Sequence, residues 1–246
     1  MRLAGVVLAA GEGRRLRPLT RYRPKALCPV GGRLLVDHAL HRLEPFCGSG
    51  PEHLAVNAHH LADQVVRHCA GRVFLSVEQP EALGTAGALV ALRPWLCGRD
   101  VLLTNADAYL PGGLARLVDG WDGERCRLLC SRVRGDGDDD GDAHVRADFP
   151  DPGATRAAGA TTTAAGAGHG LRYVGACLLP AGAVAALPAG IHGLYEALWR
   201  DEQRAGRLDL AVLAPQDVAV DCGTPGDYLL ADRHAWQVRT GTSGNQ

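Results

Sequence analysis

The order in which short apolar runs alternate with longer segments is the feature that most limits the fold. The first run, Leu3 to Ala9, contains no polar residue and leads into Ala10-Gly11-Glu12-Gly13. A short apolar run that ends in glycines is typical of a buried parallel strand followed by a loop. The N-terminal segment therefore predicts a strand whose carboxyl end opens into a loop that can hold phosphate.

The same alternation continues along the chain. Helices are expected near Leu34–Leu43, at Leu61–Cys69, Thr85–Leu92 and Gly193–Ala205, and from Pro225 to about Trp236. Further strands are expected at His53–Asn57, Val73–Val77, Asp100–Thr104, Arg127–Val133, Leu171–Leu179, Leu208–Leu213 and Asp217–Val220. This order predicts an α/β fold with one Rossmann-like, doubly wound, mostly parallel sheet and helices on both faces. Ligands of such sheets bind at the carboxyl ends of the strands, where Gly11, Asn57 and Asp107 fall.

Composition favours a single core. The chain has 246 residues, 46% of them hydrophobic, which suffices for one α/β domain. We place that domain at residues 1–236, followed by a short polar tail at 237–246. The eight cysteines contain no CxxC pair, so we interpret them as small core residues rather than as disulfide partners or zinc ligands.

The balance of charge excludes some partners. With 26 basic and 27 acidic residues, the net charge of −1 argues against a general nucleic-acid binder, which needs a basic face. No run approaches the roughly 18 apolar residues of a membrane span, and the N-terminus lacks a signal-peptide layout. We therefore expect a cytoplasmic protein with no membrane contact. The acidic run Asp136 to Asp142 matches only half of an EF-hand loop and is expected to be a solvated loop.

One loop carries a strong local positive charge. Six cations lie within twelve residues: Arg14, Arg15, Arg17, Arg21, Arg23 and Lys25, the only lysine of the chain. Six positive charges can neutralise a triphosphate, and the glycines at positions 11 and 13 let backbone amides approach an anion. The dinucleotide pattern GxGxxG fails because Leu16 occupies the third glycine position, and no P-loop GK[ST] is present.

This loop, LAAGEGRRLRPLT continued by RPKALCPV, resembles the signature loop of the sugar-1-phosphate nucleotidylyltransferases. That family makes NDP-sugars and pyrophosphate from an NTP and a sugar 1-phosphate, and the likeness is greatest to mannose-1-phosphate guanylyltransferases and to short uridylyltransferases. The resemblance implies catalytic roles for Lys25, Arg15 and Asp107. It also implies nucleotide binding by Leu8, Ala10, Gly11, Gly13 and Arg15. The resemblance leaves open whether the protein forms a homodimer.

A second segment, Leu83-Gly-Thr-Ala-Gly87, lies where a strand end enters a helix. Glycines there allow a flat base to lie against the backbone. The segment resembles the base-binding element of the same family, which implies nucleotide binding by Glu78, Gly84, Thr85 and Gly87. The alternative is that Gly84 and Gly87 serve only the packing of the helix.

Two aspartates follow apolar strands. Asp107 comes after Leu102-Leu-Thr-Asn-Ala, and Asp221 ends the run Val218-Ala-Val. Mg²⁺ prefers oxygen ligands and needs only one or two carboxylates when substrate phosphates complete its shell. Both positions match the metal aspartates of the family, which implies that Asp107 and Asp221 hold Mg²⁺. For Asp107 the alternative is a cap of the following turn.

The resemblance implies sugar binding by Asn57, Asn105 and Gly175. For Asn57 a helix start with exposed histidines is an equal alternative. Many family members have a Glu-Lys-Pro element before the strand that holds Gly175, whereas this chain has Gly153 to Gly170 there and no lysine. The identity of the sugar is therefore open.

The predicted reaction is the Mg²⁺-dependent transfer of NMP from an NTP to a sugar 1-phosphate. The acceptor phosphate is itself a nucleophile, so no Ser, Cys or His needs activation. The likeness to mannose-1-phosphate guanylyltransferases at the LGTAG segment implies GTP and a mannose- or heptose-type sugar. The alternatives are a uridylyl- or cytidylyltransferase with another phosphate or phosphonate acceptor, and a non-catalytic regulator that binds nucleotide sugars.

Overall fold

The computed structural model describes residues 3–133, 149–150 and 170–241. The acidic run at 136–142, the glycine-rich stretch at 153–169 and the last five residues of the predicted tail lie outside the described residues. No helix among the described residues is long and apolar enough to cross a membrane.

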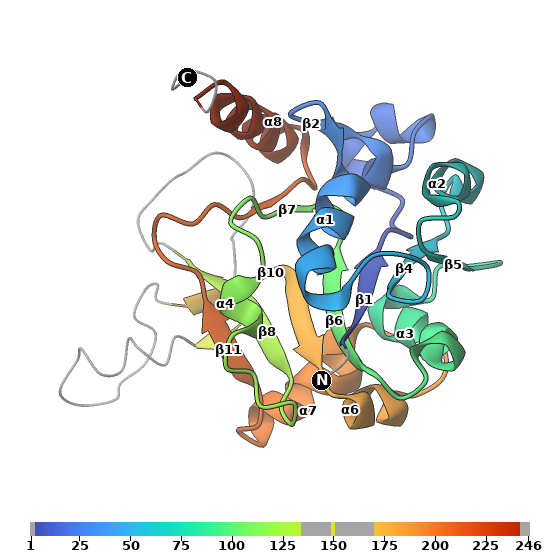
Figure 1. The fold of residues 1–246 in the computed structure, drawn as a ribbon, viewed down its shortest axis with the longest axis vertical. Helices are drawn as coiled ribbons and strands as arrows, with labels where there is room; N and C mark the ends of the chain where they lie inside the picture. The colour runs from blue at the N-terminus through green and yellow to red at the C-terminus, as the bar shows by residue number, and fades with distance from the viewer. Residues whose placement is uncertain (1–2, 134–148, 151–169, 242–246) are drawn as a thin grey trace.

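The chain folds around a mixed sheet of eight strands (Figure 1). Seven follow the order β11 (Asp209–Val212), β8 (Arg127–Arg132), β10 (Gly170–Leu179), β6 (Asp100–Asn105), β1 (Leu3–Leu8), β4 (Leu54–Ala58) and β5 (Phe74–Val77), and β9 (Phe149–Pro150) pairs with β10. Strand β10 runs antiparallel to its neighbours β6 and β8, whereas β1, β4, β5 and β6 are mutually parallel and β11 is parallel to β8. The predicted mostly parallel α/β sheet is confirmed, with one reversed central strand.

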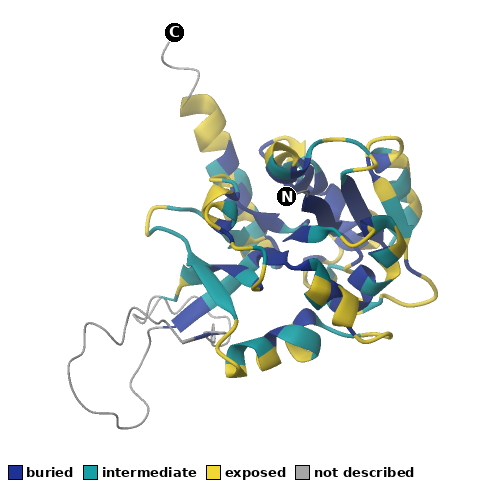
Figure 2. Cartoon of the chain, turned by 60° about the horizontal axis from the view of Figure 1, so that its bottom comes forward, coloured by how far each residue is buried: buried dark blue, intermediate teal, exposed yellow. Residues whose placement is uncertain are grey.

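Helices cover both faces of this sheet. On one face pack α1 (Leu35–Cys47), α2 (Ala62–Cys69) and α4 (Ala115–Val118), and on the other α3 (Gly84–Leu96), α6 (Ala181–Ala186) and the π-helical turn η4 (Tyr195–Trp199). Alternate strand residues serve the two cores, as Val7 does on the α1 face and Val6 on the α3 face. The central strands are accordingly buried, whereas the helices expose their outer sides (Figure 2).

Three strand ends come together at one edge. Leu8 of β1 is in register with Asn57 of β4 on one side and with Asn105 of β6 on the other. The chain runs outward from β1 through β4 to β5 and then returns to β6 on the opposite side of β1. Such a reversal leaves a crevice outside the carboxyl ends of the strands, which is where open α/β sheets bind ligands.

Several short elements near this edge have no counterpart in the sequence predictions. They are the one-turn helices η1 (Arg14–Leu16), η2 (Leu19–Arg21) and η3 (Lys25–Leu27), the hairpin β2 (Pro29–Val30) and β3 (Arg33–Leu34), and β7 (Ala108–Tyr109). The predicted strand at Asp217–Val220 is wrong over most of its length, since only β12 (Val220–Asp221) pairs, with β7. The side chain of Asp217 instead accepts a hydrogen bond from the amide of Ala214, which closes a turn.

The C-terminal region also differs from the prediction in its details. The helix predicted at Gly193–Ala205 is present over most of that range, and its first part is the π-helical turn η4, which continues directly into α7 (Arg200–Arg204). The final helix, α8 (Pro225–Gly241), passes the predicted end near Trp236 by five residues. It packs beside the β2–β3 hairpin (Figure 1).

Candidate active site

Lys25 and two aspartates meet at the edge where the strands end. The Nζ atom of Lys25 lies 2.6 Å from Oδ2 of Asp107 and 3.5 Å from Oδ1 of Asp221. The lysine is 8% exposed, whereas the side chains of Asp107 and Asp221 are 32% and 59% exposed. A buried ammonium group therefore holds together two carboxylates that remain open to a ligand.

Short backbone pairings put the two aspartates side by side. Asp107 lies in the turn between β6 and β7, and β7 pairs antiparallel with β12, so that Asp221 stands opposite Ala108. The amide of Cys222 donates a hydrogen bond to the carbonyl oxygen of Asp107 at 2.9 Å. Because these bonds join backbone atoms, the relative position of the carboxylates does not depend on Lys25 alone.

The carboxylates influence each other electrostatically. The pKa of Asp221 is raised above its ordinary value, first because surrounding protein atoms reduce its hydration and then because the Asp107 carboxylate is close, with Lys25 and Arg15 opposing the rise. Two like charges that face one point suit a divalent cation, and Mg²⁺ accepts two carboxylates together with phosphate oxygens and water. Three or more His, Cys, Asp or Glu side chains gather nowhere in the described part of the chain.

Four cations of the signature loop divide into two pairs. Arg14 and Arg17 form ion pairs with Glu12, at 2.7 and 3.2 Å, and the hydrogen bond from Arg14 lowers the pKa of Glu12 to about 2. Arg15 instead lies with NH2 3.7 Å from Oδ2 of Asp221, and its side chain is 66% exposed. Arg15 and Lys25 are thus the two cations that face the carboxylates.

Gly13 allows the loop to fold over Lys25. Its φ of +61° lies in the left-handed region, and a Cβ atom there would lie 2.9 Å from the Cγ2 atom of Thr20 and 3.2 Å from the Cβ atom of Lys25. The hydroxyl of Thr20 donates to the carbonyl oxygen of Gly13 at 2.7 Å. At Gly11 an added Cβ would meet no described atom within 4 Å, so space is open beside the loop.

Asn57 and Glu78 lie behind the site rather than on its surface. They are 3% and 2% exposed. The amide oxygen of Asn57 accepts from the backbone of Ala9 at 2.6 Å, and its Nδ2 donates to Glu78 at 2.7 Å. Glu78 also accepts from the amide of Leu83 at 2.8 Å. This geometry favours a role in joining the glycine loop to the LGTAG segment, where the sequence predicted direct sugar contact for Asn57 and nucleotide contact for Glu78.

The glycines of the LGTAG segment pack against another part of the backbone. A Cβ at Gly84 would lie 2.6 Å from the carbonyl oxygen of His192, and one at Gly87 would lie 2.5 Å from that of Gly190. The hydroxyl of Thr85 accepts from the amide of Leu194 at 2.7 Å. The packing alternative therefore accounts for both glycines, and their contact with a base stays a prediction.

Two adjoining hollows lie along the strand ends. The first, of about 240 Å³, is lined by both aspartates together with Asn105, Arg172, Tyr173 and Gly175. The second, of about 250 Å³, is lined by Leu8, Thr85, Asn105, Tyr173, Glu196 and Trp199. Asn105 and Tyr173 line both, so the two hollows adjoin at these residues. The predicted sugar residues Asn105 and Gly175 are thus brought to the aspartates, and Asn57 is not.

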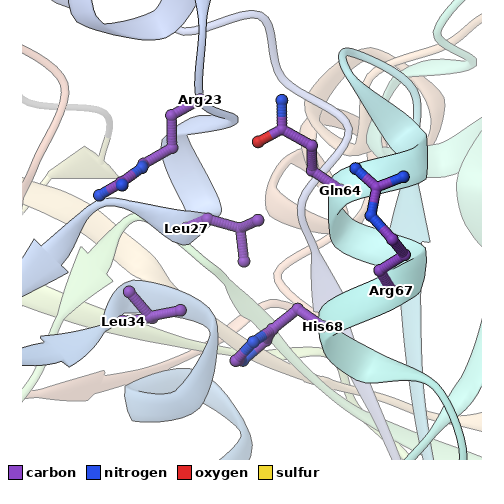
Figure 3. Close-up of a pocket in the computed structure, with 6 residues that line it drawn as sticks. All are labelled: Arg23, Leu27, Leu34, Gln64, Arg67 and His68. Carbon is purple, nitrogen blue, oxygen red and sulfur yellow. The ribbon is translucent and has the colours of Figure 1, made fainter.

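A larger hollow of about 470 Å³ lies elsewhere, between α2 and the segment at residues 23–34 (Figure 3). Arg23 and Arg67 lie on two sides of it, and Leu27 and Leu34 form part of its apolar wall (Figure 3). None of the predicted site residues lines it. Its size alone therefore does not make it the active site.

Three residues that lie at or next to the two hollows were not predicted from the sequence: Arg42, Tyr173 and Trp199. The two aromatic residues form an edge-to-face pair with ring centroids 4.8 Å apart and line the second hollow. Arg42 is buried in α1 next to the end of β6. A signal for Arg42 was present, because a charged residue stands among apolar ones at helical spacing, whereas no local pattern marks the aromatic pair.

A glycine loop with a buried lysine, facing two carboxylates where the sheet order reverses, defines a protein that handles nucleotide phosphates. Comparison with known proteins makes this specific. The chain belongs to the MobA-like NTP transferase domain family, whose model matches residues 5–204. It is a sugar-1-phosphate nucleotidylyltransferase, as predicted.

Individual relatives agree with this family. The chain is 33% identical to an N-acetylmuramate alpha-1-phosphate uridylyltransferase of Caulobacter vibrioides over 243 residues, which is 92% of this chain and 94% of the relative. In fold it resembles a putative glucose-1-phosphate thymidylyltransferase from Bacillus anthracis, with a TM-score of 0.70, 16% identity and 95% of both chains covered. It also resembles a UDP-glucose pyrophosphorylase from Acinetobacter baumanii, with a TM-score of 0.66, 16% identity and coverage of 97% and 94%.

Proposed function

We propose that this protein transfers UMP from UTP to a sugar 1-phosphate, and that the acceptor is an amino-sugar phosphate of the N-acetylmuramate α-1-phosphate type. The observation that carries the proposal is the 33% identity, along almost the whole chain, to a uridylyltransferase with that acceptor. The predicted preference for GTP and mannose rests only on the LGTAG segment. Backbone packing is enough to explain the glycines of that segment. The uridylyltransferase alternative is therefore the better supported reading.

The geometry suggests how the residues divide the work. The acceptor phosphate lies in the hollow beside Asn105 and Gly175, and the triphosphate lies along the loop from Gly11 to Arg15. An oxygen of the acceptor phosphate attacks the α-phosphorus of UTP, and the bond from that phosphorus to the oxygen shared with the β-phosphate breaks, which releases pyrophosphate. Lys25 stabilises the charge that develops on the phosphates, and catalysis depends on positioning and charge neutralisation.

Asp107 and Asp221 would hold Mg²⁺. When bound there, the ion neutralises phosphate charge and orients the reacting groups. A non-catalytic binder of nucleotide sugars would not require a buried lysine between two open carboxylates, and that arrangement favours turnover. A cytoplasmic location and a homodimer stay predictions.

The test is a matrix of pyrophosphate release. Each of UTP, GTP, CTP and ATP is combined with the 1-phosphates of N-acetylmuramate, N-acetylglucosamine, mannose and glucose, and with phosphocholine. We expect the highest kcat/KM for UTP with N-acetylmuramate α-1-phosphate. A maximum at GTP with mannose 1-phosphate would instead support the guanylyltransferase alternative, and a maximum at CTP with phosphocholine the cytidylyltransferase one.

Two variants and a chelation step extend this experiment. Asp107→Asn should reduce turnover by on the order of 10²-fold or more, because it removes a carboxylate from the predicted metal pair. Asp122→Asn lies in an exposed turn, where the carboxylate contacts the amides of Glu124 and Arg125 and the Arg125 side chain, and it should leave turnover unchanged. Chelation of Mg²⁺ should abolish activity reversibly. Near-normal pyrophosphate release by Asp107→Asn would contradict the metal assignment.

A further inference from the structure

A buried arginine lies directly behind the acceptor hollow. Arg42 belongs to α1, whose other inward residues, among them Leu35, Ala39 and Leu43, are apolar and fully buried. Arg42 itself is 7% exposed, and burial lowers its pKa to about 10. A group with that pKa still carries its positive charge near neutral pH.

Stability does not account for this charge. No acidic side chain in the described part of the chain forms an ion pair with Arg42, and its Nε atom is buried without a hydrogen-bond partner. A buried charge without a counter-ion destabilises a fold, and an apolar side chain of similar size packs better. The reason for a charge at this place must therefore lie in its contacts.

Its contacts lead to the strand ends. The NH2 atom of Arg42 donates to the hydroxyl of Thr104 at 3.1 Å and approaches the carbonyl oxygen of Asn105 at 3.4 Å. The Thr104 hydroxyl has one proton, which it donates to the carbonyl oxygen of Gly175 at 3.2 Å. Thr104 is completely buried. A chain of two hydrogen bonds thus runs from α1 through β6 to β10.

The chain of hydrogen bonds that starts at Arg42 ends at an irregular point of the sheet. The pairing of β10 with β8 shifts register between Tyr173 and Cys177, and Gly175 within that shift has a φ of +86°. A Cβ atom at Gly175 would lie 2.9 Å from that of Ala108 and 3.3 Å from Nδ2 of Asn105. A bulge of this kind re-aims side chains and needs support, because it leaves the ladder locally unpaired.

We propose that Arg42 is a positioning residue for the acceptor. It holds Thr104 and the Gly175 bulge in one arrangement, so that Asn105 and Gly175 present a preformed surface to the sugar phosphate. Among the described residues, no hydrogen bond joins the nucleotide loop at residues 9–15 to Arg42, Thr104 or Gly175, and Arg42 therefore acts more on acceptor binding than on NTP binding. The inference rests on the proposed location of the acceptor.

The test compares four variants with the wild type, using the best NTP and acceptor from the pyrophosphate matrix. Arg42→Met and Thr104→Val each break the first hydrogen bond with little change of volume. Each should raise the KM for the acceptor by about tenfold and change the KM for the NTP by less than about twofold. Arg42→Lys, which keeps the charge and a donor, should recover part of the loss. The double variant should be no worse than the poorer single one, because both act on one chain of contacts.

Arg93→Met is the matched control. Arg93 in α3 also donates to backbone carbonyl oxygens, those of Val184 and Leu187, but lines neither hollow. It should lower the thermal midpoint while leaving both KM values unchanged. If Arg42→Met fails to fold, Thr104→Val decides the question. Equal changes in both KM values, or an unchanged acceptor KM in Thr104→Val, would overturn the proposal, while the wild-type matrix tests the proposed function separately.

Discussion

At the scale of single residues, one ammonium group lies between the two carboxylates of the candidate site. Lys25 is the only lysine of the chain, and its Nζ atom lies within 4 Å of both aspartates. An ammonium group is a compact point charge that fits between two carboxylates, whereas a guanidinium group is a planar fork with fixed donor directions. The site therefore depends on the shape of the cation as well as on its charge.

Lys25→Arg tests this dependence. We expect kcat/KM to fall by on the order of 10²- to 10³-fold, because a fork in this buried place displaces Asp107 and Asp221. Steady-state kinetics measures the loss, and thermal unfolding checks that the variant is folded. Arg21→Lys, an exchange of cations at an exposed position of the same loop, is the control and should be nearly silent. Wild-type activity in Lys25→Arg would reduce Lys25 to a structural partner of the aspartates.

At the scale of elements, the site is assembled from strand ends that side chains join. Asn57 at the end of β4 bridges Ala9, after β1, to Glu78, after β5. Glu78 passes the link to Leu83 at the start of α3. This link can affect substrate binding without direct contact between either side chain and a substrate. Together, Asn57 and Glu78 hold the glycine loop and the LGTAG segment in one relative position.

Asn57→Ala should leave the Ala9 amide and one oxygen of the buried Glu78 without their partner. We expect a loss of about 2 kcal/mol in the free energy of unfolding, together with a higher KM for UTP. Denaturant titration and steady-state kinetics measure the two effects.

Asp100→Ala is the matched control for Asn57→Ala. Asp100 also bonds a backbone amide, that of Ala181, but stands at the opposite end of β6. It should lose stability without a change in the KM for UTP. A normal KM in Asn57→Ala would show that the link serves stability alone.

At the scale of the whole molecule, the C-terminal helix packs on a hairpin that lies early in the chain. Helix α8 packs on the hairpin that follows Lys25, and its Asp232 accepts a hydrogen bond from the amide of Gly31 at 2.8 Å. Both Gly31 and Gly32 have positive φ, as the tightest hairpin turn requires. The same small core includes Cys222, next to Asp221. Docking of α8 thus supports two segments of the site at once.

Gly31→Ala tests this packing of α8 on the β2–β3 hairpin. The new Cβ atom would lie 2.5 Å from that of Ala235, so we expect strain from the left-handed backbone and a displaced α8. Gly98→Ala is the matched control, because Gly98 has a φ of +72° but an added Cβ meets no described atom within 4 Å. The control should lose roughly 1–2 kcal/mol, and Gly31→Ala should lose more. Each kcal/mol corresponds to about 2–4 °C in Tm for a chain of this size. Equal losses would mean that α8 adapts freely.

Local patterns in the sequence determined much of this protein. Hydrophobic runs predicted the mixed order of strands and helices, because a strand or helix shows its buried face as a period in the chain. Lys25, Asp107 and Asp221 stood out because each lies in a short motif at the end of an apolar strand or in a glycine loop. Those three residues do meet in the structure.

Only the tertiary structure decided how distant side chains pair. The reversed direction of β10, the bridging role of Asn57 and Glu78, and the place of Arg42 beneath the acceptor hollow have no local signature that specifies a partner. Hydrogen-bond partners far apart in the chain depend on which strands become neighbours, and short-range propensity does not encode that order. The sequence by itself therefore singled out the lysine and the two aspartates, and the packing of the sheet determined which buried groups hold them in place.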